Sequence, residues 1–302
     1  MNVLSLFDGM SCGRIALDKA KIEVDNYYAS ELDKYAIKVS QANYPDTVQL
    51  GDVTKWREWD IDWKSIDLLI GGSPCQGFSF AGKQLAFDDP RSKLFFIYVE
   101  ILNHIEAFNP NIKFLLENVK MLKDHLEVIS DYLDVEPVFI NSALVSAQNR
   151  QRYYWTNWYF KLPEAKSIAL KDIVQGSGVK VDRKKSNAII ASIGRTTPRE
   201  YFYKRQGQVV FVDRDKSYCV DANYYKGANW TQYLTKSRRQ LVVEFINNDY
   251  LVRKLTPIEC ERLQTVPDDY TNHVSNTQRY KMLGNGFTVD VIAHIFKNLI
   301  KT

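Results

Sequence analysis

The chain has 302 residues, 45% of them apolar and 25% charged, with a formal net charge of +4. This size suits one large domain with a smaller appendage. No stretch approaches the roughly 18 apolar residues of a membrane span, and no signal peptide fits before the strand-like residues 2–7, so we expect a soluble, intracellular protein. The four cysteines form no CxxC pair and there are only four histidines, which argues against a zinc site or a disulfide framework.

The first half of the chain alternates short strand-like runs with helical patterns, which predicts a parallel α/β sheet. The expected strands are residues 2–7, 27–30, 67–72 and 113–117. Between the last two, residues 92–108 carry apolar side chains at helical spacing, which indicates a helix buried on one face. After Pro163 the pattern loosens into Gly-, Ser- and Lys-rich stretches with short strand-like pieces such as residues 208–212. We therefore place a domain boundary near residue 160.

Basic charge is concentrated beyond that boundary. Residues 161–249 contain 17 Lys and Arg against 9 Asp and Glu, whereas the rest of the chain has 23 against 27. The segment also interleaves aromatic with basic side chains, which suits phosphates and nucleobases. A solvated basic face has the same composition, so composition alone leaves both interpretations open.

Residues 5–13, Ser-Leu-Phe-Asp-Gly-Met-Ser-Cys-Gly, lead from the first strand through a glycine-containing turn into a helix. Such a turn lets a ligand approach the backbone, and an acidic residue about 20 positions later can bind ribose hydroxyls. Glu31 fits that role, and Asp52 could accept from an adenine amino group. Because the turn lacks the full dinucleotide fingerprint, an ordinary α/β turn remains the alternative.

Cys75 follows an apolar strand in the segment Gly-Gly-Ser-Pro-Cys-Gln-Gly-Phe-Ser, residues 71–79. Ligands of open α/β sheets bind at the carboxyl ends of the strands. A thiol at that edge is a candidate nucleophile. An isolated cysteine is more often structural, so the neighbouring motifs have to decide.

These motifs resemble the ordered set of the DNA cytosine-5 methyltransferases. Three of them are Pro74-Cys75-Gln76, Glu117-Asn118-Val119 and Gln148-x-Arg150-x-Arg152. The resemblance extends over nearly the whole chain through residues 7–13, 31, 52, 87–96, 253–270 and 284–286, with segments similar to bacterial and phage members and to the animal de novo branch.

The resemblance implies a Rossmann-like α/β fold that depends on S-adenosyl-L-methionine, with a smaller target-recognition domain. Residues 1–160 would form the catalytic and cofactor-binding domain and residues 161–252 the target-recognition domain. Residues 253–302 would form a motif segment and a C-terminal helix that returns to the catalytic domain.

The resemblance also implies the chemistry. Cytosine C5 is a poor nucleophile, and addition of a thiolate to C6 makes it reactive. Cys75 matches this nucleophile, Glu117 the carboxyl group that hydrogen-bonds N3 and the exocyclic amine, and Arg152 the arginine that contacts O2. The resemblance also places Arg150 among the catalytic residues, where it would brace a loop of the site or bind a phosphate. The target base lies inside a duplex, so it has to be flipped out.

The same resemblance assigns the cofactor ligands. Residues 160–252 carry no family motif, so their contacts to DNA are expected from the donor chemistry and charge of their side chains. The expected cofactor ligands are Phe7, Asp8, Gly9, Met10, Ser11, Glu31, Leu32, Asp52, Val53, Pro74, Leu94 and Asn285. The expected partner is double-stranded DNA, and no metal or membrane is expected to bind. The expected location of the protein is the cytoplasm of a bacterial or phage-host cell. Contacts to DNA are expected from Gln76, Ser79, Lys83 and Arg91 in a closing loop, from Arg195, Arg199, Arg205, Asn223, Asn229 and Gln232 at base edges, and from Arg238 and Arg239 at phosphates.

Two other functions stay open. A transfer-RNA cytosine-5 methyltransferase uses the same motifs, but that branch typically carries Pro-Pro-Cys and Cys-Phe-Thr, whereas this chain has Ser-Pro-Cys and no Cys-Phe-Thr. A non-enzymatic DNA-binding regulator would be expected to have lost Cys75, Glu117 or the cofactor acids. The chain departs from the family pattern at Asp8, often alanine, at Ser11-Cys12, and at Gly286-Phe287, where a small residue and valine are commoner.

Overall fold

The computed structural model describes residues 1–73, 93–175, 216–226, 236, 241–246 and 249–299. The chain divides into two compact units. Unit 1 comprises residues 1–142, 151–164 and 287–302, and unit 2 comprises residues 143–150 and 165–286. The domain division expected from the sequence stays a prediction. Residues 253–286 of its last segment belong to unit 2 and residues 287–302 to unit 1.

Unit 1 is built on a seven-stranded sheet with the order β3-β2-β1-β4-β5-β8-β6. Its strands are β1 (Asn2–Leu6), β2 (Asn26–Ser30), β3 (Val48–Gln49), β4 (Leu68–Gly71), β5 (Lys113–Val119), β6 (Val138–Asn141) and β8 (Gln151–Thr156). Strands β3, β2, β1, β4 and β5 run parallel to one another, and β8 is antiparallel to its neighbours β5 and β6. The sheet confirms the α/β fold class, and all four strands expected from the sequence are present.

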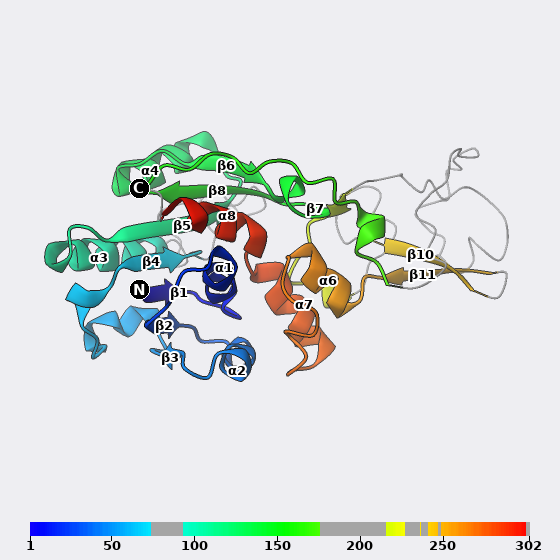
Figure 1. The fold of residues 1–302 in the computed structure, drawn as a ribbon, viewed down its shortest axis with the longest axis horizontal. Coiled ribbons are helices and arrows are strands. Elements are labelled where there is room, and N and C mark those ends of the chain that lie inside the picture. Colours follow the sequence, from blue (N-terminus) through cyan, green and yellow to red (C-terminus); the bar gives the residue numbers. More distant parts are fainter. Residues whose placement is uncertain (74–92, 176–215, 227–235, 237–240, 247–248, 300–302) are drawn as a thin grey trace. The chain divides into compact units, whose positions relative to one another are not determined.

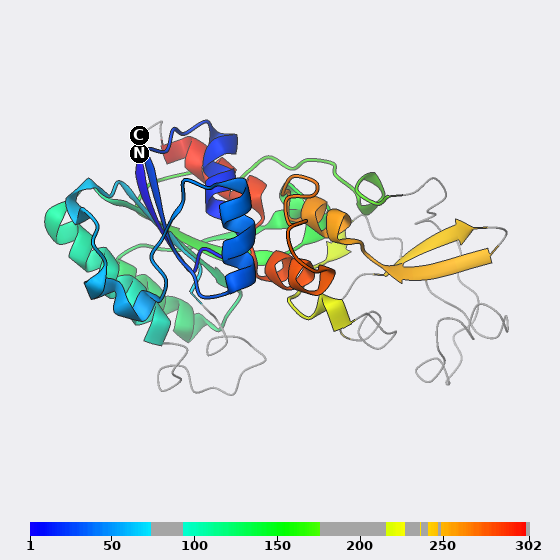
Figure 2. The same ribbon diagram turned by 90° about the horizontal axis from the view of Figure 1, so that it is seen from below.

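Helices cover both faces of this sheet (Figures 1 and 2). They are α1 (Cys12–Ala20), α2 (Lys34–Asn43), α3 (Lys93–Phe108), α4 (Lys123–Leu133) and α8 (Val289–Leu299), with 3-10 turns η1 (Val53–Glu58) and η2 (Trp63–Ser65). Helices α3 and α4 pack on one face, and α1 lies beside α8 on the other, where Lys19 pairs with Asp290 at 2.9 Å. Gly13 permits the close approach of α1, because a Cβ there would lie 2.3 Å from Ile70 Cδ1.

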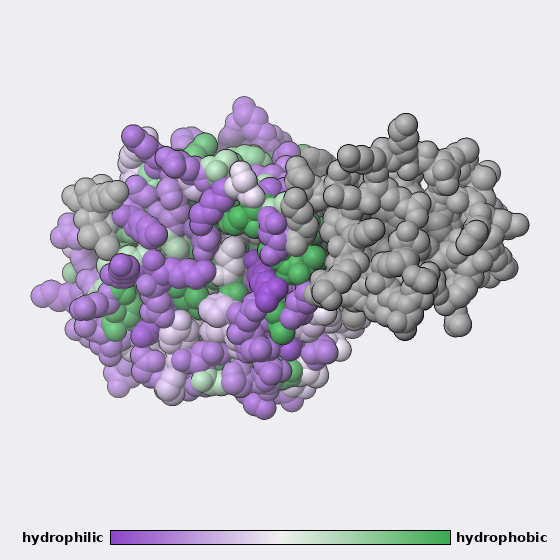
Figure 3. All heavy atoms as spheres, turned by 45° about the vertical axis from the view of Figure 1, so that its right-hand side comes forward, coloured by the Kyte–Doolittle hydropathy of each residue, from purple (hydrophilic) through white to green (hydrophobic). Residues whose placement is uncertain are grey.

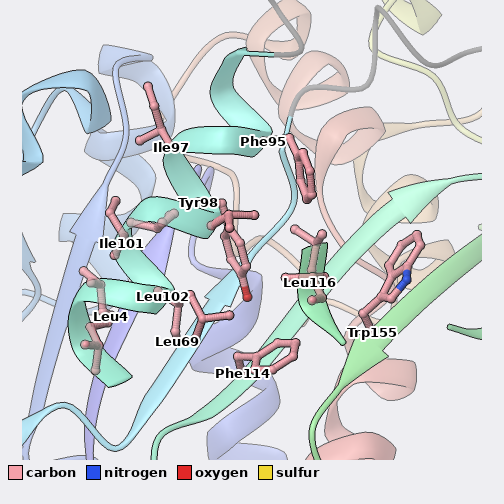
Figure 4. Close-up of a cluster of buried hydrophobic side chains, with 14 of the residues drawn as sticks. Leu4, Leu69, Phe95, Ile97, Tyr98, Ile101, Leu102, Phe114, Leu116 and Trp155 are labelled. Atoms are coloured by element: carbon pink, nitrogen blue, oxygen red, sulfur yellow. The ribbon is translucent and has the colours of Figure 1, made fainter. Parts of the chain in front are cut away.

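The main core lies between the sheet and α3 (Figure 4). Alternate strand residues such as Leu4, Leu69 and Leu116 point into it, as the two-residue period of a strand requires. Helix α3 contributes its apolar stripe, including Tyr98 and Ile101. The buried helix expected over residues 92–108 is therefore confirmed.

Unit 2 contains short elements. They are β7 (Gln148–Asn149), β9 (Ser217–Tyr218), β10 (Leu241–Ile246), β11 (Asp249–Lys254), α6 (Pro257–Leu263) and α7 (Asn276–Asn285), with 3-10 turns η4 (Leu170–Asp172) and η5 (Tyr224–Lys226). The turn η3 (Ser142–Leu144) spans the boundary between the units. Strands β7 and β9 pair in parallel, and β10 and β11 form an antiparallel hairpin. The strand-like residues 208–212 lie outside the described residues.

The described residues on the face shown in Figure 3 are largely polar. Hydrophilic residues cover most of the coloured surface in Figure 3. Over the described part of the chain, no helix has the length and apolarity that crossing a membrane requires. The same residues contain no cluster of three or more His, Cys, Asp or Glu side chains that could hold a metal ion.

Candidate active site

The polar residues of the candidate site follow the carboxyl ends of neighbouring parallel strands. Residues 7–11 follow β1, Glu31 follows β2 and Asp52 follows β3, whereas Gly72 and Ser73 follow β4. Glu117 lies inside β5, one residue beyond the Leu116–Gly71 pair. Because parallel strands end at one edge of a sheet, these residues share the edge where α/β folds bind ligands.

Residues 7–11, named the cofactor turn here, have an unusual backbone. Phe7, Gly9 and Ser11 adopt left-handed conformations with φ of 57°, 62° and 62°. Glu31 stabilises the turn from the next strand: its Oε2 accepts from Gly9 N at 2.8 Å and its Oε1 from the amides of Leu32 and Asp33 at 2.7 and 2.8 Å. The cofactor turn is thus hydrogen-bonded directly to Glu31, the residue expected to bind the ribose.

Asp8 points into the protein. Its carboxylate accepts from the hydroxyls of Ser5 at 2.6 Å, Tyr27 at 2.7 Å and Ser11 at 2.5 Å, and the residue is only 8% exposed. Burial raises the pKa of the Asp8 carboxyl, the three hydroxyls oppose this, and the charge of Glu31 raises it further. These contacts favour a buried role for Asp8 over direct binding of a ligand.

Asp52 caps η1 and stays accessible. Its Oδ1 accepts from the amide and the hydroxyl of Thr54 at 2.9 and 2.8 Å, and these bonds, the amide first, lower the pKa of Asp52. Of the apolar candidates, Met10 and Val53 are buried, Phe7 and Leu94 are half-buried against the core, and Leu32 is 69% exposed.

The acceptors at this edge fit S-adenosyl-L-methionine. Adenosine offers ribose hydroxyls and an adenine amino group as donors, and the carboxylates of Glu31 and Asp52 are acceptors at neighbouring strand ends. Gly9 and Gly51 both have positive φ, and a Cβ at either would meet no atom within 4 Å among the described residues. The backbone is therefore open to a ligand at both turns.

Glu117 and Arg152 form a partly buried ion pair. Arg152 Nε lies 2.8 Å from Glu117 Oε1, and the side chains are 15% and 11% exposed. Strand β8 brings Arg152 there, since its antiparallel register pairs Val119 with Arg152. Gly72 lies close to both Glu117 and Phe287: a Cβ at Gly72 would be 2.9 Å from Phe287 Cε1 and 3.2 Å from Glu117 Oε2.

Ser73, which precedes Cys75 by two positions in the sequence, is joined to the end of β5. Asn118 Nδ2 donates to Ser73 Oγ at 3.3 Å, and Asn118 Oδ1 accepts from Val119 N at 2.8 Å. Both Ser73 and Asn118 are buried. The ends of β4 and β5 are therefore joined by side chains two residues before Cys75.

Arg150 lies in unit 2 and is only 3% exposed. Its Nη1 donates to the Gly284 carbonyl at 3.2 Å and contacts Cys219 Sγ at 3.1 Å, and its Nη2 donates to the Gly286 carbonyl at 3.0 Å. Contacts of this kind favour the bracing role over a phosphate contact or a direct part in the chemistry.

A family model of the C-5 cytosine-specific DNA methylases matches residues 1–301. The chain belongs to this family. It is 32% identical to the Type II methyltransferase M1.ScrFI of Lactococcus lactis subsp. cremoris over 99% of this chain and 78% of that protein. It is 28% identical to the Type II methyltransferase M.HhaI of Haemophilus parahaemolyticus over 99% and 94%.

Among solved structures, a methyltransferase of Entamoeba histolytica superposes with a TM-score of 0.71 at 16% identity, covering 100% of this chain and 98% of that one. At this identity the likeness shows the shared fold. The family and its Type II relatives establish that the chain is a DNA cytosine-C5 methyltransferase whose cofactor is S-adenosyl-L-methionine.

Many residues expected in the site of this methyltransferase lie outside the described part of the chain. They are Pro74, Cys75, Gln76, Ser79, Lys83, Arg91, Arg195, Arg199, Arg205, Asn229, Gln232, Arg238 and Arg239. Asn223 and Asn285 are described, and both are exposed residues of unit 2. The roles expected for all of these residues stay predictions.

Sequence reasoning missed several partners of the methyltransferase site. Tyr27 and Ser40, which surround the cofactor turn, carry no motif and could not have been found from the sequence. Phe287 was visible only as a departure from the family pattern. Ser73 was visible only as the neighbour of Pro74-Cys75.

Proposed function

We propose that this methyltransferase modifies cytosine in duplex DNA through covalent addition of Cys75 to the base, with Glu117 as the acid that assists the addition. The observation that carries the proposal is the Glu117–Arg152 ion pair beside Gly72 and Ser73, the residues that precede Pro74-Cys75 in the sequence. Membership of the DNA methylase family supplies the reaction class.

In the first step the Cys75 thiolate forms a bond to C6, and the C5–C6 double-bond electrons move toward N3. Glu117 donates a hydrogen bond or proton to N3 as negative charge develops there. Arg152 holds Glu117 Oε1, which leaves Oε2, on the side of Gly72, to face the base. Arg152 would also contact O2 of the cytosine.

C5 then bonds to a methyl group as the N3–C4 double bond re-forms, and N3 returns any proton it received to Glu117. When bound, S-adenosyl-L-methionine supplies that group. Loss of the C5 proton to a base re-forms the C5–C6 double bond and expels the Cys75 thiolate. Glu31 and Asp52 would accept from the ribose and adenine of the cofactor.

The burial of the acid supports the proposal that the target base is flipped out. The Glu117 and Arg152 side chains are 11% and 15% exposed, so a cytosine stacked in a duplex could not reach them without leaving the helix. Stacking and edge hydrogen bonds in a pocket recover part of the cost of extrusion. The expected closing loop and, apart from Asn223, the expected base-reading residues lie outside the described residues, so their contacts with DNA remain part of the proposal.

The decisive experiment uses duplex DNA that contains 5-fluorocytosine, because fluorine at C5 cannot leave as a proton. The full chain should form a covalent complex in the presence of the methyl donor, and Cys75→Ala should form none. Cys260→Ala is the matched control, since Cys260 is buried in α6 and should leave adduct formation intact.

Three results would count against the proposal. A Cys75→Ala protein that still transfers methyl groups would exclude the covalent step. Methylation of transfer RNA in preference to duplex DNA would assign the transfer-RNA activity instead. Binding of DNA without any methyl transfer by the native chain would favour a regulator.

A further inference from the structure

Asp8 is the centre of a buried hydrogen-bond network around the cofactor turn. Its three hydroxyl donors come from different elements: Ser5 from β1, Tyr27 from β2 and Ser11 from the end of the turn itself. The Ser11 hydroxyl also lies 2.6 Å from that of Ser40 on α2. Since Ser11 donates to Asp8, Ser40 has to donate to Ser11.

The carboxylate suits this position because it is an acceptor with two oxygens. Oδ1 accepts from both Ser5 and Tyr27, and Oδ2 accepts from Ser11. All three donors are directed at the carboxylate, and the residue is only 8% exposed, so the carboxylate is turned into the protein.

The turn needs such support because its backbone is strained. Phe7 and Ser11 are non-glycine residues with φ of 57° and 62°, a conformation that costs free energy and persists only when the surroundings enforce it. Asp8 lies between them, and its backbone accepts from Ser11 N at 3.2 Å and donates to Ser30 O at 3.1 Å. The side-chain network and these backbone bonds act on the same residues.

The same turn positions the candidate ribose ligand. Gly9, next to Asp8, donates its amide to Glu31 Oε2 at 2.8 Å. A turn that relaxes when its buried anchor is removed therefore carries the Glu31 carboxylate away from its place.

We propose that Asp8 is a positioning residue that sets the affinity for the cofactor without touching it, by holding the cofactor turn in its left-handed conformation through Ser5, Ser11 and Tyr27. The inference rests on the cofactor site assigned above to Glu31 and Asp52. It removes Asp8 from the direct ligands and gives a function to a residue that departs from the alanine common in the family.

The test measures binding of S-adenosylhomocysteine, the demethylated cofactor, to the full chain by titration calorimetry. Asp8→Ala removes all three acceptor contacts and should weaken binding by about tenfold or more, since the loss of one hydrogen bond to a charged group is itself worth about a factor of ten. Asp8→Asn keeps an oxygen for Ser5 and Tyr27, and its amide can donate to Ser11 if Ser11 turns toward Ser40. It should bind within about threefold of the native chain.

Two further variants separate positioning from general stability. Tyr44→Phe removes a comparable bond, from the Tyr44 hydroxyl to Asp18 Oδ2 at 2.6 Å, outside the turn, and should leave affinity unchanged. Ser11→Ala removes one donor inside the turn and should weaken binding even if Asp8→Ala fails to fold. Melting temperatures measured alongside show how much stability each variant loses.

Three outcomes would overturn the inference. Native affinity in Asp8→Ala or Ser11→Ala would mean that the network does not shape the site. An Asp8→Asn protein as weak as Asp8→Ala would mean that the charge itself acts on the cofactor. If Tyr44→Phe weakened binding of S-adenosylhomocysteine as much as Asp8→Ala does, the loss of affinity would reflect a general loss of protein stability. Failure of the proposed function shows separately, as absence of the Cys75 adduct with S-adenosylhomocysteine binding intact.

Discussion

Replacing Gly72 by alanine should impair catalysis more than folding. The new Cβ would lie 2.9 Å from Phe287 Cε1 and 3.2 Å from Glu117 Oε2, closer than such atoms normally approach. Both neighbours are ends of side chains and can shift, so we expect a loss of about 1–3 kcal/mol of stability, the usual cost of overpacking. The shift of Glu117 breaks its geometry with Arg152, and displacement by about 1 Å lowers the rate up to about 100-fold.

The assay compares kcat for methyl transfer with the free energy of unfolding in urea. Gly71→Ala is the matched control: its Cβ would crowd Tyr98 at 3.0 Å, where α3 packs on β4, and should cost similar stability while kcat survives. Phe287→Val, placed in the Gly72→Ala background, should restore part of kcat because it removes the nearest ring atoms. Unchanged kcat in Gly72→Ala, or no recovery with Phe287→Val, would refute the reasoning.

Three other predictions concern buried polar groups. Tyr98→Phe should raise the free energy of unfolding by about 1 kcal/mol, because the Tyr98 hydroxyl is buried without a hydrogen-bond partner among the described residues; a lower value in urea melts would contradict this. The raised pKa of Asp8 predicts a contribution to stability that is greatest at acid pH and is lost as pH rises through the folded pKa. The native chain should therefore lose stability relative to Asp8→Asn from about pH 4 upward. A difference in stability between the two proteins that does not change with pH would contradict this prediction. Arg279→Met should lower the free energy of unfolding by about 3–5 kcal/mol, because it leaves the fully buried Glu261 without the guanidinium 3.0 Å away. A loss under about 1 kcal/mol in the same melts would show that the backbone amides of Asp269 and Thr271, which donate to Glu261, stabilise its charge sufficiently.

The sheet could be predicted from the sequence because its signals are local. Strands β1, β4 and β5 are short apolar runs, and α3 shows its buried stripe in the spacing of its own residues. The expected end of β5 at Glu117 was two residues short. The strand continues to Val119 because β8 pairs with it as far as Arg152, and no local pattern reports a partner 33 residues later in the chain.

The side-chain environment of the site could not be predicted in the same way. The motif around Asp8 indicated a ligand-binding turn, but the inward direction of its carboxylate depends on Tyr27 from the next strand and Ser40 from α2. Phe287 reaches Gly72 across 215 positions of sequence. Contacts between distant segments of this kind arise from the packed fold, and a single sequence contains no periodic signal for them.

The strand order brings together in unit 1 the residues proposed for cofactor binding and those proposed for base chemistry. From β1 the chain first builds outward through β2 and β3, then returns to place β4 on the other side of β1. This reversal between β1 and β4 is the position where doubly wound sheets bind their ligands. The acids proposed for the cofactor follow β2 and β3, whereas Glu117 and Arg152 lie on β5 and β8. Leu6 pairs with Gly71 across the reversal, so the cofactor turn begins beside the segment that leads to Cys75, and a methyl donor and a flipped base held by the two halves would meet there.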